Sequence, residues 1–92
     1  MIRVVIASQL HRFFPALKDR TLTVDAATAS AAIRAVNELA PGFADYVIDE
    51  RGALRRHVSV FIGEDMVIDR ERLSDRVPEG GTVFVFQALS GG

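Results

Sequence analysis

The 92-residue chain contains no cysteine. This absence excludes thiol catalysis, cysteine-ligated zinc or iron–sulfur sites and a disulfide framework. Of its 11 lysine and arginine residues only Lys18 is a lysine, so the chain offers few amines for self-conjugation. The net charge is −1 and no basic block occurs, so neither nucleic acid nor an anionic membrane is an expected partner. The first apolar run, residues 1–6, is too short for a signal peptide or a membrane span, so we expect a cytoplasmic protein.

The remaining composition is that of an ordinary globular domain. Hydrophobic residues make up 49% of the chain and charged residues 25%. This length supports one domain with a single modest core.

Short runs of β-branched and aromatic residues predict five strands. They are Ile2–Ala7, Thr21–Asp25, His57–Ile62, Met66–Ile68 and a final strand that begins at Thr82. The first two strands should pair antiparallel, because the connection between them is short. Within that connection Pro15 prevents a long helix, and we expect a loop or short turn whose phenylalanines fold back on the core.

One amphipathic helix is predicted over residues 29–40, capped by Thr28 or Ser30. Its apolar positions recur at helical spacing: Ala29, Ala32, Ile33, Val36, Leu39 and Ala40. Pro41 and Gly42 end it. Residues 43–56 should contain a short helical turn, and the charged loop 69–76 should be anchored by Leu73.

This order of elements predicts an α+β fold of the β-grasp type, a mixed sheet of about five strands crossed by one main helix. In that arrangement the first and last strands lie parallel at the centre, and the helix covers one face of the sheet. The other face must meet solvent or a partner.

Alternation along the strands predicts which side chains lie on the uncovered face. If Val83 and Val85 face the helix, Phe84, Phe86 and Ala88 face away, as does Phe61 on the third strand. Such a cluster of apolar side chains usually marks an interaction surface. The alternative is that residues 43–56 fold over these rings and bury them.

The chain closes on Ser90, Gly91 and Gly92, which have almost no side chain to pack. We expect a domain over residues 1–89 and a thin tail over residues 90–92. Glycine allows close approach of another backbone, so this tail fits a narrow site on another protein. The reactive group would then be the α-carboxyl of Gly92.

These features resemble the ubiquitin-like sulfur carriers of the MoaD/ThiS type over nearly the whole chain. Two stretches carry the resemblance: residues 57–65, and residues 78–83 together with the ending Ala88-Leu89-Ser90-Gly91-Gly92. The middle loop has the longer form found in molybdopterin-synthase small subunits and cysteine-pathway carriers. Ser59 and Gly63 stand where the family often has asparagine, and Gly81 where it often has aspartate, so the branch within the family stays open.

The resemblance implies that Gly92 is adenylated by a ubiquitin-activating-type adenylyltransferase that uses ATP and magnesium. Sulfide, or a persulfide made by a cysteine desulfurase, would then give a thiocarboxylate. A free carboxylate is ionised at neutral pH and is a poor electrophile, which is why activation is needed. A sulfur-accepting synthase would receive the sulfur, for molybdopterin, cysteine or another metabolite. The chain itself would bind no cofactor and would be a co-substrate rather than an enzyme.

Three alternatives use the same fold, and the simplest is a plain β-grasp interaction module whose tail is inert. The tail of a protein modifier would be joined to lysines of other proteins, whereas a molybdopterin-synthase small subunit would bind a larger subunit.

The remaining candidate residues concern docking and acid–base chemistry. Docking would use the aromatic side chains with Ala88 and Leu89, and Arg55 and Arg56 if the partner is acidic. Gly91 and Ser90 would thread the partner's channel. His11 and His57 have no neighbouring nucleophile or metal-ligand spacing and are assigned structural roles, so we predict no catalytic residue and no metal site.

Overall fold

The computed structural model describes residues 1–18 and 21–87 of the chain. Its elements are β1 (Ile2–Ile6), α1 (Ser8–His11), the 3₁₀ helix η1 (Pro15–Leu17), β2 (Leu22–Val24), α2 (Ala29–Leu39), α3 (Phe43–Val47), β3 (Val58–Ile62), β4 (Asp65–Met66) and β5 (Thr82–Gln87). The predicted α+β class, the main helix and the short helical turn after it are confirmed.

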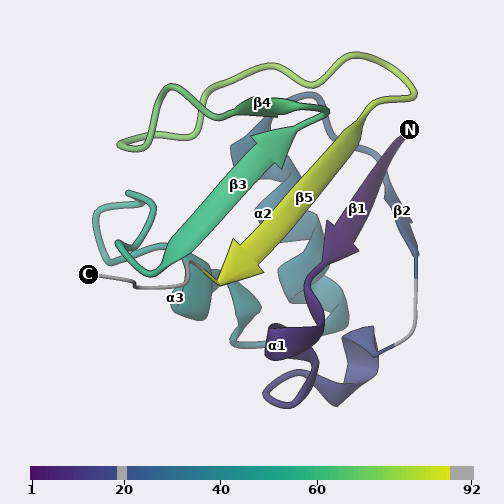
Figure 1. The fold of residues 1–92 in the computed structure, drawn as a ribbon, viewed down its shortest axis with the longest axis vertical. Helices are drawn as coiled ribbons and strands as arrows, with labels where there is room; N and C mark the ends of the chain where they lie inside the picture. The colour runs from purple at the N-terminus through teal and green to yellow at the C-terminus, as the bar shows by residue number, and fades with distance from the viewer. Residues whose placement is uncertain (19–20, 88–92) are drawn as a thin grey trace.

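The described strands form one mixed sheet in the order β2-β1-β5-β3-β4 (Figure 1). β1 and β5 run parallel, with Val4 opposite Val83, and occupy the interior of the sheet. β2 pairs antiparallel with β1, and β3 pairs antiparallel with β5. This is the predicted arrangement, in which β5 has a hydrogen-bonded neighbour on each side.

α2 crosses one face of this sheet, behind the strands in Figure 1. Its side chains at helical spacing are buried: Ala29, Ala32, Ile33 and Val36. Ala40 is also buried, but Leu39 is exposed. Only one side of the last turn faces the core, so including Leu39 in the apolar stripe was wrong.

The start of α2 is fixed by a side-chain cap and by a loop from later in the chain. Thr28 Oγ1 accepts a hydrogen bond from the N–H of Ala31 at 3.1 Å. The N–H groups of Ala29 and Ser30 donate to the carbonyls of Asp75 and Leu73, at 3.0 and 2.9 Å. The first N–H groups of the helix are therefore satisfied without water.

Replacing Thr28 with valine is expected to lower the free energy of unfolding by about 1 kcal/mol, because it removes this cap and keeps the β-branched shape. Urea denaturation followed by circular dichroism measures the change. Stability equal to that of the wild type would show that the loop contacts alone hold the start of α2.

Residues 8–17 were predicted as a loop or short turn and form two short helical turns, of which Pro15 begins the second, where its missing N–H costs nothing. One strand differs in detail from the prediction. The fourth strand was predicted over Met66–Ile68, but the observed strand β4 ends at Met66. The N–H of Ile68 donates instead to Asp75 Oδ2 at 2.9 Å, which draws the chain away from the sheet.

Loop 67–76 is held to the domain by its own side chains. Leu73, the predicted anchor, is buried although its φ is 54°, a left-handed value uncommon for leucine. Around it the Asp69 carboxylate accepts hydrogen bonds from the main-chain N–H groups of Glu71, Arg72 and Ser74 and from the Ser74 hydroxyl. These hydrogen bonds lie within the loop. The carbonyls of Leu73 and Asp75 tie it to the start of α2, because they accept from the N–H groups of Ser30 and Ala29.

Candidate functional site

The face of the sheet opposite α2 carries the candidate site. Along β5 the side chains of Val83 and Val85 are buried towards α2, whereas Phe84 is half-buried and Phe86 is exposed. The same alternation holds on β3, where Val60 is buried. The predicted division of side chains between the two faces is confirmed for the described residues, and the prediction for Ala88 lies outside them.

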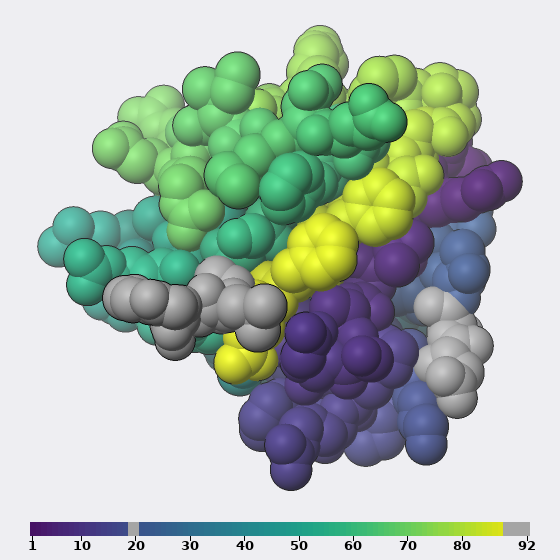
Figure 2. Space-filling view, in the orientation of Figure 1, coloured from purple at the N-terminus to yellow at the C-terminus, as the bar shows by residue number. Residues whose placement is uncertain are grey.

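Phe61, Phe84 and Phe86 form a cluster that we call the aromatic patch. Phe61 lies opposite Phe84 in the β3–β5 register. The Phe61 and Phe86 rings meet edge to face with centroids 5.8 Å apart, and the Phe84 and Phe86 rings are stacked at 6.1 Å. With Gly63 these rings line an open, apolar hollow of about 420 Å³. In Figure 2 the side chains of β5 reach the surface between β3 and β1.

Two neighbours that sequence reasoning missed widen the patch. Val5 of β1 lies beside Phe84 in the parallel register and is 37% exposed. Met66 of β4 lies opposite Phe61 and is 50% exposed. Alternation within β1 could have identified Val5. To place Met66 on this face, the pairing register of β3 and β4 must be known. An error of one residue in that register would move the Met66 side chain to the other face.

Residues 43–56 do not bury the patch. The ring of Phe43 contacts Phe14, with centroids 5.4 Å apart. The ring of Tyr46 contacts Phe13, Phe14 and His57. Phe86 remains 39% exposed, so the alternative of a covering loop does not hold for the described residues.

The tail, with the α-carboxyl of Gly92, lies outside the described residues, as do Gly91, Ser90, Leu89 and Ala88. Their predicted roles stay predictions. The last described residue is Gln87, which lies opposite Val58 at the beginning of β3.

Arg55 and Arg56 come just before His57 and β3. The first residue of β3, Val58, is paired with Gln87, the last residue of β5. Arg55 is held in place, because its Nε donates to the carbonyl of Asp45 at 2.8 Å. Arg56 is exposed. Both arginines thus precede Val58, the residue paired with Gln87 at the end of β5, and Arg56 is the more exposed of the two.

The histidines have structural contacts. His11 Nε2 lies 2.9 Å from the carbonyl oxygen of Ile6, and the His57 ring packs edge to face on Tyr46. Among residues 1–18 and 21–87, no group of three or more His, Asp or Glu side chains could hold a metal ion. No helix in the same ranges is long and apolar enough to cross a membrane.

Gly80 and Gly81 form the turn that leads into β5. Gly80 has a φ of 78°, and the N–H of Gly81 donates to the carbonyl of Pro78 at 2.8 Å. A Cβ on Gly81 would lie 2.9 Å from that carbonyl oxygen. The turn in this chain therefore leaves no space for the aspartate that the resembling family often has at this position.

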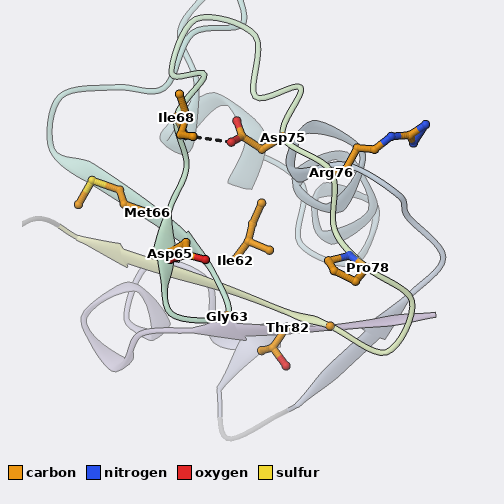
Figure 3. A pocket seen from close by; sticks show the side chains of 10 residues that line it. Ile62, Gly63, Asp65, Met66, Ile68, Asp75, Arg76, Pro78 and Thr82 are labelled. Carbon is orange, nitrogen blue, oxygen red and sulfur yellow. Dashed lines mark hydrogen bonds between the residues drawn. The ribbon is translucent and has the colours of Figure 1, made fainter.

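A second hollow lies at the opposite end of β5 from Gln87. Figure 3 shows it between the β3–β4 turn and the loop that leads to β5, with Pro78 and Thr82 on one side and Met66 and Ile68 on the other. Its volume is about 400 Å³, and Gly63 lines both this hollow and the one at the aromatic patch. Sequence reasoning did not identify it, because its walls come from two separate segments.

Two surface carboxylates have lowered pKa values. The Ser74 hydroxyl and the Arg72 N–H lower the pKa of Asp69, and the N–H groups of Ala53 and Arg51 lower that of Asp49. In each case the hydrogen bonds favour the charged form.

Because the folded pKa of Asp69 is below its unfolded value, its carboxylate stabilises the fold above the unfolded pKa, about 3.9, and less as pH falls through the folded value. Asp69→Asn is therefore expected to be less stable than the wild type near pH 7. The difference should shrink as pH falls below about 4. Urea midpoints between pH 2 and pH 7 measure it, and a difference independent of pH would contradict this role.

Comparison with known proteins assigns the fold. No family model matches the chain, and no curated protein matches it. Among solved structures, a chain of the Amycolatopsis orientalis BexX/CysO complex matches with a TM-score of 0.83 and 21% identity, covering 100% of both chains. Mycobacterium tuberculosis CysO matches with a TM-score of 0.82 and 20% identity over 97% of this chain and 100% of that one.

SAMP1 from Haloferax volcanii matches with a TM-score of 0.76 and 22% identity, over 99% of this chain and 98% of that one. The protein thus has the ubiquitin-like β-grasp fold of SAMP1 and CysO, as the resemblance to MoaD/ThiS carriers implied.

Proposed function

We propose that this protein is a sulfur carrier that bears its reactive sulfur on the α-carboxyl of Gly92. The observation that carries the proposal is the position of the aromatic patch. The patch lies on β3 and the interior strand β5, and the sequence reaches Ser90-Gly91-Gly92 a few residues after β5 ends at Gln87.

The chemistry would take place in partner enzymes. A carboxylate oxygen of Gly92 attacks the α-phosphorus of ATP and pyrophosphate leaves, which gives an acyl-adenylate. Sulfide then attacks the acyl carbon and AMP leaves, which gives the thiocarboxylate. The adenylyltransferase supplies the ATP and magnesium site, while this chain supplies the acyl group and a docking surface.

The structural likeness supports an interaction with such partners. One similar chain comes from a BexX/CysO complex, which shows that a protein of this fold forms a complex with another protein. We propose that this protein docks through the aromatic patch, together with Arg55 and Arg56 just before β3. A sulfur-accepting synthase would use the same surface after the tail is loaded.

A second candidate is a protein modifier, because one similar structure is the small archaeal modifier protein 1 of H. volcanii. Both candidates begin with adenylation of Gly92 and differ in the product. The modifier would form an isopeptide bond with a lysine of another protein, whereas the carrier would form a free thiocarboxylate.

The test incubates the protein with a ubiquitin-activating-type adenylyltransferase from the same cell, ATP, magnesium and sulfide. Mass spectrometry then searches for both products, the thiocarboxylate on Gly92 and, after trypsin, lysines joined to the C-terminal tryptic peptide 77–92 that follows Arg76. The carrier reaction predicts the first product alone. Lysine adducts without a thiocarboxylate would favour the modifier, and neither product would overturn both.

A further inference from the structure

The end of β5 is paired on one side only. The register with β1 reaches Val85, opposite Ile6, and the register with β3 continues to Gln87, opposite Val58. Beyond Val85, therefore, β3 is the one strand paired with β5 in the described chain. The direction of the chain at Gln87 depends on whatever else contacts that residue.

A side chain from α3 makes such a contact. Alternation places Gln87 on the same face as the buried Val83 and Val85, and Gln87 itself is half-buried. A polar side chain in that position needs a hydrogen-bond partner. The hydroxyl of Tyr46 donates to Gln87 Oε1 at 3.2 Å and supplies one.

The ring of Tyr46 contacts three other rings, and these contacts fix the position of its hydroxyl. The Phe13 ring is stacked on Tyr46 with centroids 5.5 Å apart. Phe14 and His57 meet Tyr46 edge to face, at 5.7 and 5.1 Å. These rings come from the segment after α1 and from the residue before β3, so Tyr46 links both segments to the end of β5.

We propose that Tyr46 is a positioning residue that fixes the direction in which the chain leaves the sheet at Gln87. This inference rests on the proposed function, because direction matters if Gly92 must reach the active site of another protein. Looser order at the strand end would lower the fraction of molecules whose chain is directed into that site, and the apparent affinity for the partner falls by the same fraction. Docking would hold the aromatic patch against the partner protein. Tyr46 would hold the end of β5 in a constant direction relative to that patch.

The first part of the test needs no partner enzyme. Tyr46→Phe keeps the ring and its three contacts and removes only the hydroxyl. ¹⁵N relaxation is expected to show lower order at the Phe86 and Gln87 amides of this variant, with Val83 and Val85 unchanged. Thr28→Val is the control, because it removes a hydrogen bond of similar strength at the far end of α2. Unchanged order at Gln87 in Tyr46→Phe, or an equal loss there in Thr28→Val, would overturn the proposal.

The second part measures adenylation through ATP–pyrophosphate exchange. Tyr46→Phe is expected to raise KM for the protein about fivefold, the size of one neutral hydrogen bond, with kcat changed less than twofold. Gln87→Leu should have the same effect, and the double variant should be no worse than either single one. Additive effects would mean that Tyr46 does not act through Gln87 and would overturn the proposal.

The two parts separate the two claims. If wild-type protein supports no exchange, the proposed function fails, and the relaxation data still decide whether Tyr46 fixes the strand end. If wild-type protein is adenylated and Tyr46→Phe behaves like it in both assays, the proposed function stands and the role of Tyr46 is overturned.

Discussion

Removal of Gly92 alone is expected to reduce thiocarboxylate formation by more than about 100-fold, and removal of Gly91 and Gly92 together is expected to abolish it. Each residue of extended chain spans about 3.3–3.6 Å, so loss of one glycine retracts the carboxylate by that distance. Reacting atoms must lie within about 3–3.5 Å of each other, and a misplacement of about 1 Å can already cost about 100-fold. The measurement is ATP–pyrophosphate exchange, followed by the mass of the product.

Folding should be unaffected by these deletions, because the core formed by the described residues is complete at Val85. Urea denaturation of each variant checks this point. Thr28→Val is the control: it changes the domain without changing the length of the tail, and it should be adenylated within about twofold of the wild type because Thr28 lies at the start of α2, outside the docking surface and the tail. Full activity after removal of both glycines would contradict the assignment of the chemistry to Gly92.

Replacing Phe86 with glutamate is expected to weaken binding to the activating enzyme by about 30-fold or more. Buried aromatic side chains at the centre of an interface commonly contribute about 2 kcal/mol or more, and each 1.4 kcal/mol is tenfold in affinity. The glutamate would also place an unpaired charge beside the Phe61 and Phe84 rings, which Phe86 contacts in the wild type. Because Phe86 is 39% exposed and points away from the core, the free protein should keep its fold.

Ile68→Glu is the control for this prediction. Ile68 is 90% exposed and lies after β4, outside the aromatic patch, so a charge there should change affinity by less than about threefold. Isothermal titration calorimetry with the activating enzyme compares the two variants. An equal loss of affinity in both variants would point to a general effect of the added charge. Unchanged affinity in Phe86→Glu would exclude the aromatic patch as the docking surface.

Periodicity predicted most of the fold, because the strongest patterns coincide with the elements of the core. The alanine-rich stretch with Thr28 before it and Pro41 after it could form little other than one capped helix. The alternation of valine and phenylalanine from Val83 to Phe86 divided the faces of the sheet correctly. These patterns are local, so neighbouring residues are enough to detect them.

Contacts between distant segments could not be predicted in the same way. The hydrogen bond from Tyr46 to Gln87 joins residues 41 positions apart. The end of β4 at Met66 depends on Asp75, and the left-handed Leu73 depends on the loop that docks on α2. Hydrophobic periodicity does not encode such polar contacts, so the loop boundaries and the second hollow were missed.

The most direct test of the account is the intact mass of the protein purified from its own cell under conditions that preserve thiocarboxylates. The account predicts a population heavier by the exchange of one oxygen for one sulfur, with the change localised to Gly92 by fragmentation. A chain that carries only the carboxylate, even after incubation with its activating enzyme, ATP and sulfide, would contradict it.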